Sequence, residues 1–194
     1  CHLDTIDWPT AFWQPEAGAW LAQHYYDHYL FSGDKEFLRQ RAYPVMKESA
    51  EFFLDYLVDD PRSPGRLVSG PSVSPENRYR LPDGQVGLLS MGPSMDHQII
   101  SGLFTQVIRA SEILGIDGEF RNTVAETQKR IPAPAIGKHG QIQEWADDYD
   151  EPYWGMGKNV WWRFARKDGA PWAIAGLWNE CTDPATREVL PSYT

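Results

Sequence analysis

The chain has 194 residues, 42% hydrophobic and 23% charged, a globular composition that excludes intrinsic disorder. Its formal charge of −9 and the lack of a basic stripe disfavour nucleic acid as a partner. No apolar run reaches the roughly 20 residues of a membrane-spanning helix, so no membrane partner is expected. Two cysteines make neither a disulfide framework nor a zinc ligand set. The chain starts at Cys1 without a signal peptide, which indicates a processed or truncated product of unknown localisation.

Apolar residues at helical spacing predict a helical hairpin near the start of the chain. The first helix covers 16–31, directly after Pro15, and its apolar face includes Trp20 and Leu21. The second begins at 35–41, is interrupted or restarted at Pro44, and continues over 43–58. Its expected apolar stripe consists of Val45, Met46, Ala50, Phe53, Leu54 and Leu57.

A second helical hairpin is predicted further along the chain. A strong helix covers 95–114 and ends at Gly115, which suits the left-handed position after a helix. Its partner covers 118–130 and ends before Pro132. The expected apolar stripe of the first of these helices consists of Ile99, Leu103, Val107, Ile108 and Ile113.

Between the hairpins, residues 61–93 are rich in Pro and Gly and show no helical period. A long ordered connection of this kind usually carries function. Within it, Pro71 and Pro75 restrict the backbone around Glu76, so this carboxyl can be aimed before a ligand arrives. Neighbouring Val73 and Tyr79 could desolvate Glu76 and raise its pKa, as a general acid requires. The alternative is a solvated glutamate that caps a turn.

A second polar cluster lies at 138–145, where amides, an imidazole, a carboxylate and an indole occur together. Such groups suit a hydroxyl-rich ligand, although they also suit a polar helix start. His24 and His28 stand one helical turn apart, but no third metal ligand is evident and packing is the better interpretation. Asp96 is expected to favour the dipole of the helix that it opens.

The last part of the chain differs in composition from the rest. Residues 1–152 carry the negative charge, whereas 153–194 are almost neutral and hold five of the nine Trp. Alternating apolar residues over 160–178 predict a β-hairpin, and 182–186 read as a second turn before Val189. We therefore predict two domains, 1–152 and 153–194, the second being a short β-rich tail of different origin.

Four consecutive strings carry a family resemblance over about residues 8–152: GAWLAQHYYDHYLFSGDKEFLRQRAYPVMKESAEFFLDYLV, SGPSVSPENRYRLPDG, MDHQII and GKHGQIQEWADDYDEP. They resemble the catalytic domain of glycoside hydrolase family 95, which contains α-L-fucosidases and some α-L-galactosidases. The resemblance implies a mainly α fold, a partial α/α toroid of helical hairpins, and inverting hydrolysis that needs no metal or other cofactor. A fucosylated oligosaccharide or polysaccharide is the implied partner.

The same resemblance implies roles for particular residues. The proton donor of the family falls in the motif that SPEN matches here, and therefore on Glu76. Other matched positions are expected to bind substrate near the cleft: Trp20, Asn77, His97, His139, Gln143, Glu144 and Trp145.

Two features depart from the family pattern. The family's general base is an Asp in a later QIDGNFG-like segment, assisted by Asn residues of an earlier segment, and this sequence has neither. The two predicted hairpins are also about a third of the closed ring. Because an open set of hairpins exposes apolar helix faces, we expect poor solubility or self-association.

The tail resembles another family. Residues 158–194 are similar to an internal β portion of the SOS-response-associated peptidase family, whose members crosslink to abasic DNA through an N-terminal Cys. Cys1 is terminal here, but the residues after it do not match that family. Three functions thus remain: an incomplete fucosidase-type hydrolase, a non-catalytic carbohydrate-binding fragment, and an abasic-DNA-crosslinking protein.

Overall fold

The computed structural model describes residues 13–74, 77–138 and 140–149, together with the backbone of 178–182 and 189–193. The chain divides into two compact units, Cys1–Asn159 and Val160–Thr194, which are described separately. The predicted boundary near residue 152 stays a prediction.

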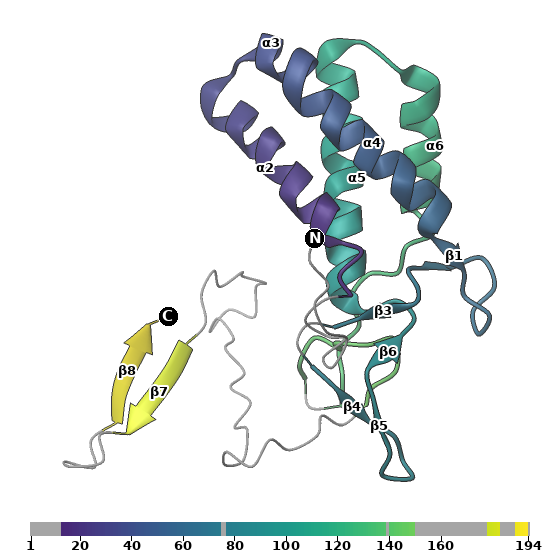
Figure 1. The fold of residues 1–194 in the computed structure, drawn as a ribbon, viewed down its shortest axis with the longest axis vertical. Coiled ribbons are helices and arrows are strands. Elements are labelled where there is room, and N and C mark those ends of the chain that lie inside the picture. Colours follow the sequence, from purple (N-terminus) through teal and green to yellow (C-terminus); the bar gives the residue numbers. More distant parts are fainter. Residues whose placement is uncertain (1–12, 75–76, 139, 150–177, 183–188, 194) are drawn as a thin grey trace, which may run out of the picture. The chain divides into compact units, whose positions relative to one another are not determined.

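The first unit is mainly α, as predicted (Figure 1). The helix α5 contacts the other three long helices of the unit. Each long helix lies within two residues of its predicted bounds at both ends: α2 (Ala17–Ser32), α4 (Tyr43–Tyr56), α5 (Ser94–Leu114) and α6 (Gly118–Gln128). Whether these hairpins belong to a toroid stays an expectation. Among the described residues, no helix has the length and apolarity to cross a membrane.

Local sequence explains where these helices begin and end. Gly33 and Gly115 follow α2 and α5 with φ values of 67° and 65°, a conformation that favours glycine. The Asp34 carboxylate accepts hydrogen bonds from two backbone N–H groups of the short helix α3 (Lys35–Phe37). The chain then runs through a π-helical turn, η1 (Leu38–Ala42), directly into α4.

Pro44 therefore does not break the second helical segment. It occupies the beginning of α4, where a missing backbone N–H is tolerated because the preceding turn is π-helical. The Tyr43 N–H bonds to the Leu38 carbonyl, five residues back, rather than four. The sequence predicts an interruption or restart at Pro44. The structure shows a π-helical turn just before this residue and a helical segment that continues through it.

The helices bury one continuous apolar core, whose largest fully buried side chains include Phe53, Phe104, Leu38, Met46, Ile100 and Leu103. The prediction that Val45 and Ile113 belong to the buried stripes is wrong, because both side chains are more than a third exposed. Each is the sequence neighbour of a buried residue, Met46 or Leu114, and one residue turns a helix by about 100°.

The helix α2 turns a different face to the core from the one predicted. Its buried residues are Ala19, Ala22 and Tyr26, whereas Trp20 and Leu21 are at least half exposed. Phe31, near its end, is 95% exposed. Small side chains let α2 lie close to α5, and the Gln23 amide donates to the Ile99 carbonyl across this contact at 3.1 Å. Apolar spacing alone could not distinguish the two faces.

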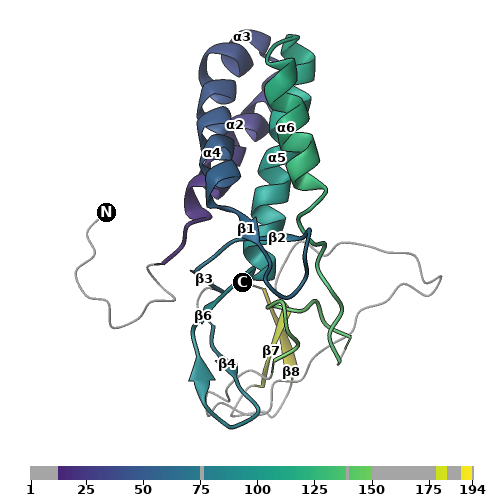
Figure 2. The ribbon, with the colours of Figure 1, turned by 90° about the vertical axis from the view of Figure 1, so that its right-hand side faces the viewer.

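The chain between α4 and α5 contains three antiparallel pairs of very short strands, which were not predicted. They lie beyond one end of the helices (Figure 2). The pairs are β1 (Val58–Asp59) with β2 (Leu67–Val68), β3 (Ser72–Val73) with β6 (Leu89–Ser90), and β4 (Tyr79–Arg80) with β5 (Val86–Gly87). Strands of two residues have no alternation that a sequence could show.

The second unit contains one antiparallel hairpin, β7 (Trp178–Thr182) and β8 (Val189–Tyr193), in which Trp178 pairs with Tyr193. The strand β7 ends at Thr182, the first residue of the predicted second turn, and β8 begins at Val189. Residues 183–188 lie outside the described residues, so the turn itself stays a prediction. The hairpin predicted over 160–178 lies almost entirely outside the described residues.

Candidate active site

Two loop segments far apart in sequence meet beside the first turn of α5. One is the link between β3 and β4, and the other is the stretch 143–149. The first segment is held at both sides, because β3 pairs with β6 and β4 pairs with β5. Glu76, the predicted proton donor, lies between these strands but outside the described residues. The structure therefore shows what surrounds Ser74 and Asn77, the nearest described residues on either side of it.

Ser74 and Asn77 both donate to the carboxylate of Glu144. The Ser74 hydroxyl lies 2.5 Å from Oε1, and the Asn77 side-chain amide lies 2.8 Å from Oε2. The Asn77 backbone N–H also donates to the Ser74 carbonyl at 2.7 Å. The Ser74 side chain is almost fully buried. Two donors of this loop therefore converge on one carboxyl group.

The backbone of Glu144 is fixed as well. The Ser94 N–H, at the start of α5, donates to the Glu144 carbonyl at 2.9 Å, and the Ser94 hydroxyl donates to the Gln143 carbonyl. The Gln143 N–H donates to the Ala135 carbonyl at 2.8 Å, where the chain returns on itself. The Gln143 side chain is partly buried. His139, predicted beside it, lies outside the described residues.

Trp145 is 3% exposed and packs among aromatic rings. Its ring meets Tyr79 edge-on at 5.5 Å between centroids, and Tyr79 stacks on Tyr149 at 4.5 Å. These three side chains help to line a cavity of about 180 Å³. The Trp145 indole N–H has no hydrogen-bond partner among the described residues.

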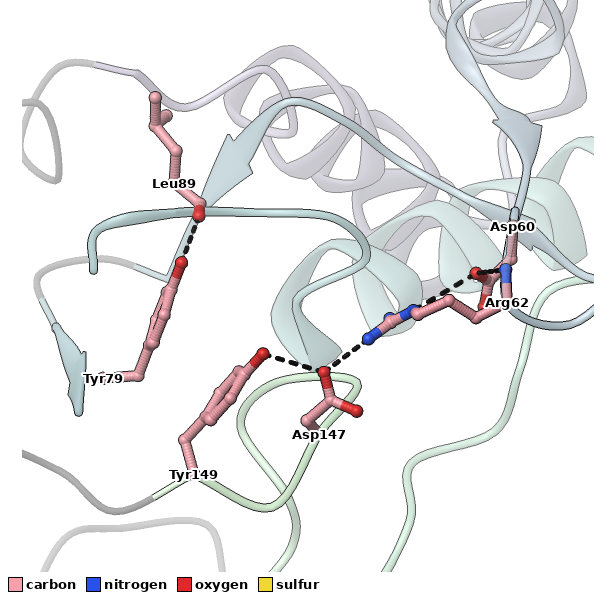
Figure 3. A network of polar contacts seen from close by, with 6 residues as sticks. All are labelled: Asp60, Arg62, Tyr79, Leu89, Asp147 and Tyr149. Carbon is pink, nitrogen blue, oxygen red and sulfur yellow. Dashed lines mark hydrogen bonds and ion pairs between the residues drawn. The ribbon is translucent and has the colours of Figure 1, made fainter. Parts of the chain in front are cut away.

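A polar chain borders this cavity (Figure 3). The Asp147 carboxylate pairs with the Arg62 guanidinium and accepts a bond from the Tyr149 hydroxyl at 2.8 Å. The Asp60 carboxylate in turn accepts from the Arg62 backbone N–H at 2.9 Å. Burial and the bond to Asp147 raise the pKa of Tyr149. Aromatic faces beside charged and hydroxyl groups are the mixture that a sugar ring requires.

Two carboxyl side chains of the first unit, those of Asp96 and Glu16, are fully buried. Ser69 donates to Asp96 Oδ2 at 2.6 Å, and burial raises the Asp96 pKa to about 6 although this bond opposes it. Glu16 is fully buried, and neither of its carboxyl oxygens has a hydrogen-bond partner among the described residues. Burial, with the Asp96 charge, raises the Glu16 pKa to about 7. Asp96 lies in the first turn of α5, where an interaction with the helix dipole was expected, and it is also fully buried.

Comparisons with known proteins match the part of the chain that contains these segments. The model of the glycosyl hydrolase family 95 catalytic domain matches residues 2–156. The chain belongs to glycosyl hydrolase family 95. The resemblance read from the sequence is thereby confirmed, with a match slightly longer than residues 8–152.

Two curated relatives of this family 95 chain carry fucosidase names. "Alpha-L-fucosidase 2" of Arabidopsis thaliana is 38% identical over 143 residues, which are 73% of this chain and 17% of that protein. "Probable alpha-fucosidase A" of Aspergillus niger is 34% identical over 139 residues, which are 70% of this chain and 17% of that protein. The chain thus spans about a sixth of the length of these relatives.

The structure brings together part of the predicted set of substrate-binding residues in this family 95 chain. Asn77, Gln143, Glu144 and Trp145 lie in the two segments that meet beside α5. Trp20 lies in the first turns of α2, half exposed, and none of the described contacts joins it to this group. Their roles toward substrate stay predictions.

His97 lies one residue after Asp96 on α5 and is 5% exposed. Burial lowers its pKa to about 4, with a further contribution from the nearby Arg66 charge, so the ring is neutral at pH 7. Its ring packs close to Gly92, whose φ of 65° and lack of a side chain make room for it. A role for His97 in substrate binding stays a prediction.

The two histidines of α2 are explained by packing and a weak ion pair. His28 lies against the Phe37 ring at 4.2 Å between centroids, and His24 is 3.7 Å from the Asp27 carboxylate. Within the described part of the chain, no three His, Cys, Asp or Glu side chains gather as a metal site would require.

Sequence reasoning did not single out several residues whose contacts or burial stand out in the structure. Ser74 belongs to the quoted loop, yet nothing in the sequence indicates its bond to a residue 70 positions away. Arg62, Asp147 and Glu16 were likewise not singled out. An ion pair across 85 positions has no local signal, and Glu16 looks like an ordinary acidic residue at a helix start.

Proposed function

We propose that this chain forms part of an α-L-fucosidase-type catalytic domain, which hydrolyses terminal α-L-fucosyl or α-L-galactosyl residues with inversion. The observation that carries the proposal is the family 95 match over residues 2–156, together with fucosidase-named relatives at 38% and 34% identity. A fucosylated oligosaccharide or polysaccharide is the proposed substrate.

In this proposal Glu76 donates the proton to the departing glycosidic oxygen. Its neighbours support the role, because Ser74 and Asn77 are tied to Glu144 on either side of it. An inverting hydrolase also needs a carboxylate base roughly 6.5 to 9.5 Å from the acid, with a water molecule between them. The family places that base in a QIDGNFG-like segment, which this sequence lacks. The chain therefore supplies the acid side of the reaction.

Substrate recognition is proposed for the cavity bordered by Trp145, Tyr79 and Tyr149. Aromatic rings offer apolar faces to the methyl group and the C–H bonds of fucose, while Asp147 and Arg62 offer an acceptor and donors to its hydroxyls.

The test measures fucose release from nitrophenyl α-L-fucoside and from fucosyllactose, whose leaving group is poor. In a complete family 95 domain that carries this segment, we expect Glu76→Gln to lower kcat on fucosyllactose by about two to four powers of ten, the usual worth of general acid catalysis. Glu51→Gln, an exposed change of the same charge on α4, is the matched control. A near-normal rate of Glu76→Gln on fucosyllactose would overturn the assignment.

A second candidate is a carbohydrate-binding fragment that does not cleave. It is favoured by the presence of the Glu144 contacts in a sequence that lacks the expected base segment. Calorimetry with fucosyllactose, with lactose as control, separates the two candidates. Fucose-dependent binding without release supports the fragment, and release supports the hydrolase. The absence of both binding and release rejects both candidates. The abasic-DNA alternative rests on Cys1 and the tail, and Cys1 lies outside the described residues.

A further inference from the structure

Glu144 is predicted to bind substrate, and its contacts with the loop point to a further role. Each of its two carboxylate oxygens accepts a hydrogen bond from this same chain, one from Ser74 and one from Asn77. Both carboxylate oxygens therefore take part in holding Ser74 and Asn77, although each oxygen can accept a further hydrogen bond.

The partners stand at informative places. Ser74 directly precedes residues 75 and 76, and Asn77 directly follows them. One side chain therefore holds both ends of the stretch that carries Glu76. The outer strands limit only where the link begins and ends, since β3 stops at Val73 and β4 starts at Tyr79.

The side chain that makes these contacts is itself well supported. Ser94 fixes the backbone of Glu144 and Gln143 at the first residue of α5. The next residue, Trp145, is buried against Tyr79, the first residue of β4. Glu144 thus connects a rigid helix to the loop, which is what accurate placement of a reacting group requires.

We propose that Glu144 is a positioning residue, whose carboxylate holds Ser74 and Asn77 and thereby sets where the Glu76 carboxyl is presented. This inference rests on the proposed function of Glu76, which it deepens. In this proposal Glu144 acts through its hydrogen bonds to Ser74 and Asn77.

The first experiment reads the contacts directly in the full chain by NMR. In Glu144→Gln the amide group replaces one acceptor oxygen by a donor, so one of the two hydrogen bonds is lost. We expect the side-chain amide protons of Asn77 to shift, and backbone hydrogen exchange at Asn77 to accelerate by about tenfold, the factor for one bond to a charged group. Glu126→Gln on the exposed face of α6 makes the same charge change and should alter neither signal.

A double-mutant cycle separates positioning from general destabilisation. If Glu144 acts through Ser74, then Ser74→Ala and Glu144→Gln together should accelerate the exchange of Asn77 by less than the product of their single effects. Exchange of the buried α5 amides should remain unchanged in every variant. Unchanged Asn77 signals in Glu144→Gln, or fully multiplicative effects, would overturn the inference whatever the activity of the chain.

The catalytic readout compares leaving groups. A misplaced acid slows only reactions that need the proton. In a complete family 95 domain that carries this segment, Glu144→Gln should therefore lower kcat on fucosyllactose by about ten- to a hundredfold and leave dinitrophenyl α-L-fucoside nearly unaffected. A residue that binds sugar would instead raise KM for both substrates. A Glu76→Gln variant with normal rates would refute the proposed function, whereas a slow Glu76→Gln beside a normal Glu144→Gln would refute only this inference.

Discussion

In the first unit, the helices are held together by different forces from the loop end, by which we mean the chain between α4 and α5 together with the stretch after α6. The helices bury a continuous apolar core, in which residues such as Phe104 and Leu103 are fully inaccessible. The loop end depends on single polar contacts, among them Glu144 with Ser74 and Asp96 with Ser69. Apolar burial is spread over many contacts and is non-directional, whereas each polar contact fixes one group in one place. Stability thus comes mainly from the helices, and precision comes from the loops.

The largest expected effect concerns the core. Phe104→Ala on α5 removes a fully buried ring and should cost about 3–5 kcal/mol of unfolding free energy, through lost burial and a cavity. Phe31→Ala on α2, which is 95% exposed, should change it by less than about 0.5 kcal/mol. Urea unfolding followed by circular dichroism measures both. Equal effects would show that the helices do not share one core.

The next effect tests the buried carboxyls of the loop end. Because burial raises the Asp96 pKa from 3.8 to about 6, its contribution to stability is full below pH 3.8 and is lost as the pH rises through about 6. Asp96→Asn keeps the shape without the charge, so its stability relative to the parent should improve between pH 4 and pH 7 by on the order of 2 kcal/mol.

Two neighbours must be included in that measurement. Glu16 has a raised pKa of about 7 and acts in the same direction as Asp96, and part of its shift comes from the Asp96 charge. His97 has a lowered pKa of about 4, so its contribution is present above pH 6.5 and is lost as the pH falls toward 4. Thermal unfolding of Asp96→Asn and of His97→Gln should therefore depart from the parent in opposite directions. Parallel pH curves would contradict the burial of these groups.

A smaller effect is expected at the exposed face of α2. Leu21 and Phe31 present apolar surface there, so the isolated chain should self-associate, as the sequence also predicts. Replacing Phe31 by Ser should weaken association by about tenfold, equivalent to 1.4 kcal/mol. Sedimentation velocity over a range of concentrations measures this. A parent chain that stays monomeric throughout would reject it.

The smallest effect is predicted for the ion pair between Arg62 and Asp147. Both side chains are about half exposed, so Arg62→Gln should cost between about 0 and 1 kcal/mol, and less in high salt. Urea unfolding at two salt concentrations is the measurement. A loss comparable to that of Phe104→Ala would mean that the loop end contributes to stability as strongly as the core.

The comparison also explains what the sequence could reveal. Helix bounds were predictable because apolar spacing and residues such as Gly115 are local signals. The buried face of α2 was not, since a helix with apolar residues on several sides has no unique inner face. The two-residue strands and the bond from Ser74 to Glu144 depend on contacts between distant segments. The family motifs pointed to two segments that the structure brings together, but they did not indicate which side chains bond to one another.

The attachment of residues 143–144 to Ser94 has a practical consequence for engineering. The chain leaves Ser94 along α5, returns through α6 and the stretch after Pro132, and is fastened again where it started. The position of Glu144 is thus set at that fastening point and not by the length of the intervening chain. Tags and spectroscopic labels therefore belong at exposed positions away from that fastening point, such as Glu51 on α4, rather than near residue 143.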